Sequence, residues 1–162
     1  MNLAVISSFV GSTISYKVIN DTITSSTSNI YSLLNSSSFT KHSLDKLIYQ
    51  LDIIQKIKLI ESVLNIIDNL HGVISHLDDL SFKKKSQEYQ TIILIINSIH
   101  EMIKNIQNDL NIINQKVIEH SNKWFSNYRS ISIDDNINNL KIHLLLLDNR
   151  YDFLIKTLTV FR

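Results

Sequence analysis

The chain contains no cysteine and no proline, and only two of its 162 residues are glycine. The lack of cysteine excludes disulfide frameworks, thiolate metal sites and cysteine nucleophiles. The scarcity of glycine leaves no material for a phosphate-binding loop or for a series of hairpin turns. Because proline is absent, nothing in the covalent backbone forces a helix to end early.

The net charge is also close to zero, because the chain has 16 Lys and Arg residues and 15 Asp and Glu residues. A net charge of +1 gives no general attraction to nucleic acid or anionic lipid, so we expect no nucleic-acid partner. What is abundant is isoleucine (28 residues), leucine (20) and asparagine (17). The excess of Ile and Asn indicates an AT-rich coding genome, such as that of a protist, a low-GC bacterium or a large DNA virus.

Apolar residues repeat at alternating spacings of three and four along four segments, which predicts four amphipathic helices. The links between the segments are short, and short links favour antiparallel neighbours. We therefore predict an all-α fold, an elongated antiparallel up-down-up-down four-helix bundle with coiled-coil-like spacing. The alternative is an antiparallel coiled coil completed by a second chain. Residues 1–162 form one domain, with helices at about 3–35, 43–79, 86–125 and 132–161.

The pattern is clearest in the last segment. Ser132 is the expected N-cap, and Asp134 and Asp135 follow it at the positive end of the helix dipole. The predicted core stripe consists of Ile133, Ile137, Leu140, Leu144, Leu147, Tyr151, Leu154, Leu158 and Phe161.

The two middle segments have longer or wider apolar faces. In the third, the stripe is Tyr89, Ile92, Ile96, Ile99, Ile103, Ile106, Leu110, Ile113, Val117, His120 and Trp124. In the second, one stripe is Ile53, Ile57, Ile60, Leu64, Ile67, His71 and Ile74, and a neighbouring one is Leu59, Val63, Ile66, Leu70, Val73, Leu77 and Leu80. An apolar arc this wide predicts that the second helix contacts more than one partner.

The first segment, residues 1–38, combines very low charge with many Ser and Thr residues. Hydroxyl side chains are mediocre helix formers, so this helix is expected to be the least stable and to break near residues 22–28. Ser7, Gly11 and Ser15 recur every fourth residue and would form a small-residue face. Such a face permits close helix packing, either within the bundle or in a membrane. The segment is too polar for a membrane span and lacks the features of a signal peptide.

No residue pattern predicts catalysis, a cofactor or a metal. Asp68 and His71 form one acid-x-x-His pair, and no second one occurs on another helix. His71 and His120 occupy stripe positions, but antiparallel hairpins would separate them by about 37 Å. We expect neutral histidines near the bundle ends, no metal site and no enzyme.

Two clusters offer a candidate interaction patch. Lys83, Lys84 and Lys85 lie in the expected second connection, either as a solvated turn or as a phosphate contact. Trp124, Tyr128 and Arg129 place aromatic and basic groups together at a helix end. They would either cap the bundle or bind a partner.

Further apolar residues lie off the stripes and would leave exposed surface, which usually marks a contact. These residues are Leu94, Ile95, Ile142, Leu146, Phe153 and Val160. We predict a non-enzymatic, intracellular bundle that acts through protein–protein contacts, as an adaptor, structural component or host-factor binder, with a homodimer favoured over a monomer. The alternative is a membrane-active bundle whose first helix engages lipid; in outline it resembles the four-helix domains of cell-death executioners.

Overall fold

The computed structural model describes residues 16–36, 44, 49, 51–74, 82–123 and 130–160, without the side chains of 16–17, 68–74 and 82–89. Its helices are α2 (Tyr16–Leu34), α5 (Ile53–Ile74), α6 (Phe82–Ser121) and α7 (Asp134–Val160). All regular structure in these residues is helical, so the predicted all-α, four-helix fold is confirmed.

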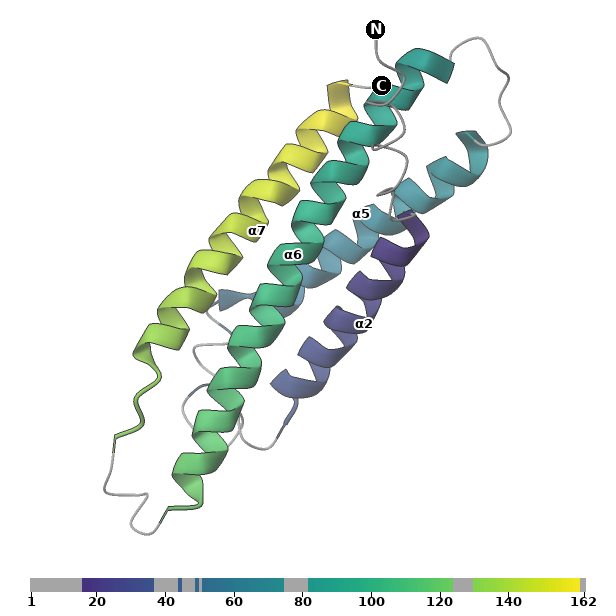
Figure 1. Ribbon diagram of the computed structural model, residues 1–162. Helices are drawn as coiled ribbons and strands as arrows, with labels where there is room; N and C mark the ends of the chain where they lie inside the picture. The colour runs from purple at the N-terminus through teal and green to yellow at the C-terminus, as the bar shows by residue number, and fades with distance from the viewer. Residues whose placement is uncertain are drawn as a thin grey trace, which may run out of the picture.

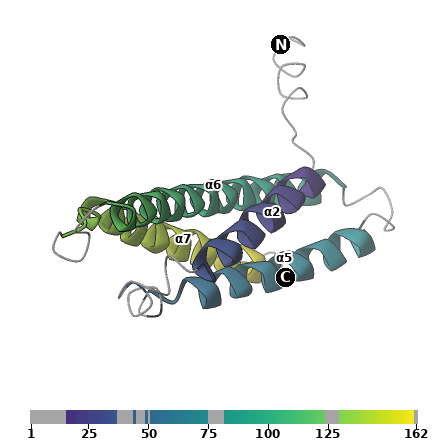
Figure 2. The ribbon, with the colours of Figure 1, turned by 90° about the horizontal axis from the view of Figure 1, so that it is seen from below.

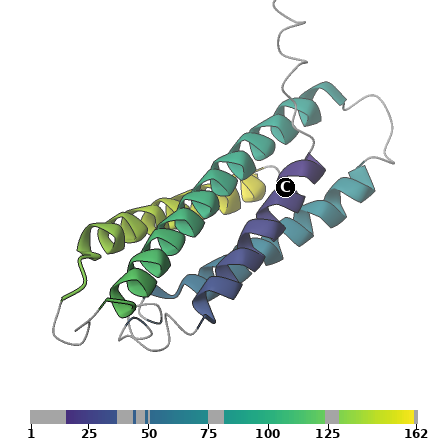
Figure 3. The same cartoon turned by 60° about the horizontal axis from the view of Figure 1, so that its bottom comes forward.

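Helix α6 is the common neighbour in the bundle. Its most extensive contacts are with α7 along one side and with α2 along the other. In Figure 1, α6 runs from teal at the top to green at the bottom, and α7 returns from light green to yellow beside it. Helix α5 has fewer contacts, with α2 and α7, and passes behind α6 in this view. Figures 2 and 3 show α2 between α6 and α5.

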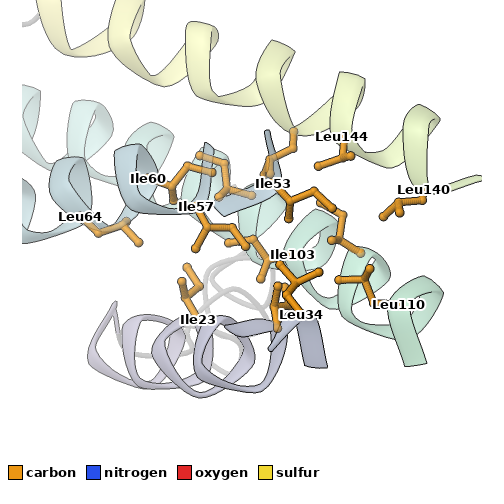
Figure 4. Close-up of a cluster of buried hydrophobic side chains, with 14 of the residues drawn as sticks. Ile23, Leu34, Ile53, Ile57, Ile60, Leu64, Ile103, Leu110, Leu140 and Leu144 are labelled. Carbon is orange, nitrogen blue, oxygen red and sulfur yellow. The ribbon is translucent and has the colours of Figure 1, made fainter. Parts of the chain in front are cut away.

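The core combines the predicted stripes of all four helices. Figure 4 shows Ile57 and Ile60 of α5 in the space bounded by Ile103 of α6, Ile23 of α2 and Leu144 of α7. Among the described side chains, the stripe residues are buried or half-buried except for Leu59 and Ile66 of the second α5 stripe, and several of the most completely covered lie at the centre of α6. The fully enclosed ones include Ile30, Ile53, Ile57, Ile96, Ile99, Ile103, Ile106, Leu110, Leu147 and Leu154.

Helix α2 is continuous through residues 22–28, so the expected break there is wrong. The hydroxyl groups donate to carbonyls of the preceding turn instead of competing with the helix: Thr22 to Val18 at 2.6 Å and Thr24 to Asn20 at 3.0 Å. Thr27 is buried in the core and donates to the carbonyl of Thr24 at 3.0 Å. The hydroxyl-rich helix therefore satisfies its own polar groups, and packing of its apolar stripe holds it in place. Residues 3–15 of the predicted helix lie outside the described residues.

The second helix does not run unbroken from residue 43, because the chain turns at Asp52 before α5 begins. Asp52 has a φ of 51°, the left-handed region that aspartate tolerates better than most residues. Its amide donates to the carbonyl of Tyr49, and its own carbonyl accepts from the amide of Lys56, the first bond of α5. Leu44 and Leu51 are helical on the other side of this turn. The predicted first residue of this helix, 43, and its predicted last residues, 75–79, lie outside the described residues.

The left-handed residue gives a direct prediction. An Asp52→Val variant should lower the free energy of unfolding by about 1–2 kcal/mol, because a β-branched side chain is disfavoured at this φ. Glycine adopts this conformation without that cost, so Asp52→Gly should keep or slightly exceed the parent stability. Urea unfolding of both variants measures the difference. Equal losses in the two variants would mean that the Asp52 side chain, and not its backbone, determines the turn.

Helix α6 begins and ends four residues earlier than the predicted range of 86–125. Lys83, Lys84 and Lys85 thus belong to its first turn and not to a connection, since lysine is a good helix former. At the other end, Ser121 and Asn122 are weaker helix formers, and the amide of Lys123 closes a tighter turn onto the carbonyl of His120 at 3.1 Å. Helix α6 therefore ends short of the predicted residue 125, and Trp124 lies outside the described residues.

Helix α7 matches its prediction closely, with Asp134 and Asp135 in its first turn. The first helical bond runs from the amide of Ile137 to the carbonyl of Ile133 at 2.9 Å, so Ile133 occupies the N-cap position in place of Ser132. Ile133 is buried, which explains why an apolar residue is placed there. The Lys116 ammonium donates two hydrogen bonds near this end of α7, one to the carbonyl of Ser132 at 3.3 Å and one to the side-chain Oδ1 of Asn136 at 2.7 Å. Phe161 lies outside the described residues.

Candidate functional site

Most of the residues proposed from the sequence as sites lie outside the described residues. These are Ser7, Gly11 and Ser15 of the small-residue face and Trp124, Tyr128 and Arg129 of the aromatic–basic cluster. The remaining members of the interaction patch, Lys83–Lys85, are placed on α6 by the backbone. The two clusters therefore remain predictions.

A buried acid–histidine pair connects α6 and α7. Asp109 is only 5% exposed, and its carboxylate Oδ2 lies 2.5 Å from Nδ1 of His143. A carboxylate only accepts hydrogen bonds, so the imidazole donates from Nδ1. The side chain of His143 is partly exposed, whereas Asp109 depends on this contact inside the interface. The pair thus joins α6 and α7 through a buried carboxylate.

Sequence reasoning did not identify this pair, although a signal was present. Asp109 precedes the stripe residue Leu110, and His143 precedes the stripe residue Leu144. Asp109 lies twelve residues before the end of α6 (121 − 109), and His143 lies nine after the start of α7 (143 − 134). Two helices joined by a short connection bring such positions to about the same level.

Helix α5 is held to its neighbours by two further polar contacts. The hydroxyl of Tyr31 on α2 donates to the carboxylate of Glu61 at 3.2 Å, and the ammonium of Lys56 pairs with Asp148 on α7. Burial raises the pKa of Tyr31 from 10.0 to about 12, and the charge of Glu61 and its hydrogen bond act in the same direction. The Lys56–Asp148 pair is more exposed and contributes little stability.

The raised pKa of Tyr31 predicts alkaline sensitivity. The unfolded chain loses the Tyr31 proton near pH 10 and the folded chain near pH 12, so this contribution to stability is present below pH 10 and is lost as pH rises toward 12. Tyr31→Phe should therefore lose less stability than the parent over that interval. Urea unfolding at several pH values tests this, with Tyr49→Phe as a control because Tyr49 is 87% exposed. Parallel curves for the parent and Tyr31→Phe would contradict the assignment.

Among the described side chains of α6, Nε2 of His100 and Oδ1 of Asn114 are buried without a hydrogen-bond partner. Burial lowers the pKa of His100, the charge of Lys104 lowers it further, and that of Glu101 opposes them. His100 is thus neutral at pH 7.

Histidines and carboxylates of the described residues do not gather into groups of three that could hold a metal ion. His71 lies on α5 and His120 in the last turn of α6, where its side chain is half-buried. Within the described part of the chain, the helices also lack the combined length and hydropathy needed to cross a bilayer. The polar contacts described above join helices, and their evident role is to position those helices.

The outer face of α7 carries apolar side chains instead. Ile142, Leu145, Phe153 and Val160 are 54%, 61%, 52% and 77% exposed, respectively. They lie opposite the buried stripe of Leu140, Leu144, Leu147 and Leu154, since the two sets differ by about half a turn at 100° per residue. We call this set the α7 outer face. The expectation that Ile142, Phe153 and Val160 leave apolar surface uncovered is confirmed.

Other helices show smaller exposed apolar areas. Leu59 and Ile66 of α5, seven residues apart, are both more than half exposed, so this part of the second α5 stripe is not covered by the described residues. Among the described side chains of that stripe, Val63 is buried while Leu59 and Ile66 are exposed, and α5 contacts both α2 and α7, as the width of its apolar arc predicted. On α6, Leu94 is 69% exposed as expected, whereas Ile95 is buried and belongs to the core.

Comparison with known proteins finds similarity to a viral protein. The chain is 33% identical over 131 residues to "Uncharacterized protein L717" of Acanthamoeba polyphaga mimivirus, an alignment that covers 74% of this chain. It spans 64% of the length of that viral protein. No protein-family model matches the chain, and no solved structure matches it.

Proposed function

We propose that this chain is a non-enzymatic helical bundle that acts through protein–protein contacts, as an adaptor, a structural component or a host-factor binder. The observation that carries the proposal is the α7 outer face, where four large apolar side chains are each more than half exposed. Apolar patches of this kind, framed by polar residues, usually mark interaction sites. Leu59 and Ile66 of α5 supply a second, smaller candidate surface.

The polar interior supports the same proposal. Asp109 and His143 satisfy each other between two helices, and Tyr31, Glu61, Lys56 and Asp148 connect α5 to the bundle. In each contact the two side chains come from different helices and bind each other. Such pairing is typical of contacts that hold helices together and not of a reaction centre.

The proposal includes a viral source and an intracellular site of action. Similarity to a mimivirus protein supports a viral source, and the isoleucine- and asparagine-rich composition is typical of an AT-rich viral genome. A bundle of this origin would meet host or viral proteins inside the infected cell.

Site-specific photo-crosslinking tests the proposal directly. A photo-reactive phenylalanine analogue at position 153 or 59, in cells that express the full chain, should give discrete protein adducts. The same analogue at Gln115, an exposed polar position on α6, is the matched control. Adducts no more abundant from positions 153 and 59 than from position 115 would refute the proposal.

The membrane-active alternative has its own measurement. The full chain should release no dye from neutral or anionic vesicles and should stay in the supernatant when the vesicles are sedimented. If the chain releases dye from either kind of vesicle, and the Gly11→Leu variant does not, the proposal of protein contacts would be replaced by one in which the first segment binds lipid.

A further inference from the structure

We propose that the α7 outer face is covered by the same face of a second copy of this chain, in an antiparallel, two-fold symmetric pair. The inference rests on the proposed function and names the partner of its main surface. Figure 1 places α7 at one edge of the described bundle.

The first argument is the spacing of the face. Ile142, Leu146, Asn149, Phe153, Lys156 and Val160 follow one another at alternating intervals of four and three residues. Leu146 is half-buried, and the other five are exposed. This is the spacing with which one helix packs along another, and it continues over 18 residues, or about 27 Å. The helix thus has a core stripe on one side and a second packing stripe on the other.

The second argument is that one antiparallel register brings apolar residues together at both ends of the face. If Asn149 lies opposite Phe153 of the second copy, then Ile142 lies opposite Val160 of that copy, and the reverse pairs follow by symmetry. The same register sets Leu146 opposite Lys156, whose aliphatic stem can cover the leucine while its ammonium reaches water. Apolar residues therefore meet at both ends of the contact.

Charge favours this orientation over the parallel one. A parallel pair would place each residue of the stripe opposite its own copy, so that Lys156 would face Lys156. Like charges facing each other oppose association. The antiparallel register separates the two lysines, because each lies opposite Leu146. Leu145, which is 61% exposed, flanks the stripe and enlarges the apolar contact.

Sedimentation equilibrium of the full chain over a range of micromolar concentrations measures the pairing. We expect twice the monomer mass for the parent and at least a tenfold weaker dimer for Phe153→Glu. Leu94→Glu is the matched control, because Leu94 on α6 is also apolar and is more exposed than Phe153. The dimer of this variant should be within twofold of the parent in stability. Circular dichroism and melting of each variant establish that the helices are intact.

Cysteine pairs then test the register, since the chain has no cysteine of its own. Under mild oxidation, a mixture of Ile142→Cys and Val160→Cys chains should form a covalent dimer, and each variant alone should form little. Efficient disulfide formation by Ile142→Cys alone would overturn the antiparallel register.

A parent chain that stays monomeric would overturn the proposed second copy. If that monomer still gives protein adducts from position 153, a different protein occupies the face and the proposed function stands. If it gives none beyond the Gln115 control, both fail.

Discussion

An Ile106→Asp chain is expected to be unfolded or aggregated at 25 °C. Ile106 is fully enclosed at the centre of α6, the helix that contacts both α2 and α7. The substitution removes a large apolar side chain and leaves a carboxylate without a partner, which together should cost more than about 4 kcal/mol. Circular dichroism and size-exclusion chromatography report the outcome. Asn108→Asp adds the same charge at an exposed position two residues away and should melt like the parent.

The second large effect concerns the acid–histidine pair. His143→Ala should lower the free energy of unfolding by about 2–3 kcal/mol, because it leaves the buried carboxylate of Asp109 without its donor. Replacing both residues, as in Asp109→Leu/His143→Leu, should recover most of that loss, since two apolar groups need no partner. Urea unfolding of the single and double variants measures the coupling.

The exposed pair of Lys56 and Asp148 provides the comparison for this measurement. Asp148→Ala should change the free energy of unfolding by no more than about 1 kcal/mol, as expected for an ion pair close to solvent. A loss in His143→Ala no larger than that in Asp148→Ala would show that Asp109 finds another partner or reaches water.

Much of this fold could be predicted from the periodicity of the apolar residues, above all in α6 and α7. The stripes of α6 and α7 repeat a strongly apolar residue every three or four positions, and Ile99, Ile103, Ile106, Leu140 and Leu144 are buried as predicted. A pattern this regular has one favourable solution, which is to turn the stripe inward.

The ends of the helices were harder to predict, because the chain lacks the residues that usually mark them. With no proline and little glycine, boundaries depend on small differences among Lys, Ser and Asn. The three lysines at 83–85 are expected in a connection, but they form part of the first turn of α6. The turn before α5 uses Asp52 in the left-handed conformation, a position where glycine is more usual. The hydroxyl groups of α2 bond within the helix, so low propensity did not become a break.

The candidate site was predictable only in part. Exposed Ile142, Phe153 and Val160 followed from their positions off the stripe, because a helix that buries one side must expose the other. The Asp109–His143 pair depends on the relative level of two helices, and a shift of one turn would separate its members. Periodicity alone does not determine that level.

The unequal contacts of α6 and α5 have a consequence for how the backbone opens. Helix α6 lies between two extensive interfaces, so its central amides become accessible only when the whole bundle unfolds. Helix α5 approaches its neighbours less closely along the backbone and begins at a left-handed residue, so we expect it to open before α6 and α7 separate. In deuterated water, the α5 amides should therefore exchange far sooner than those around Ile103 and Ile106. A single protein would thus contain a persistent two-helix centre and a more readily detached flank.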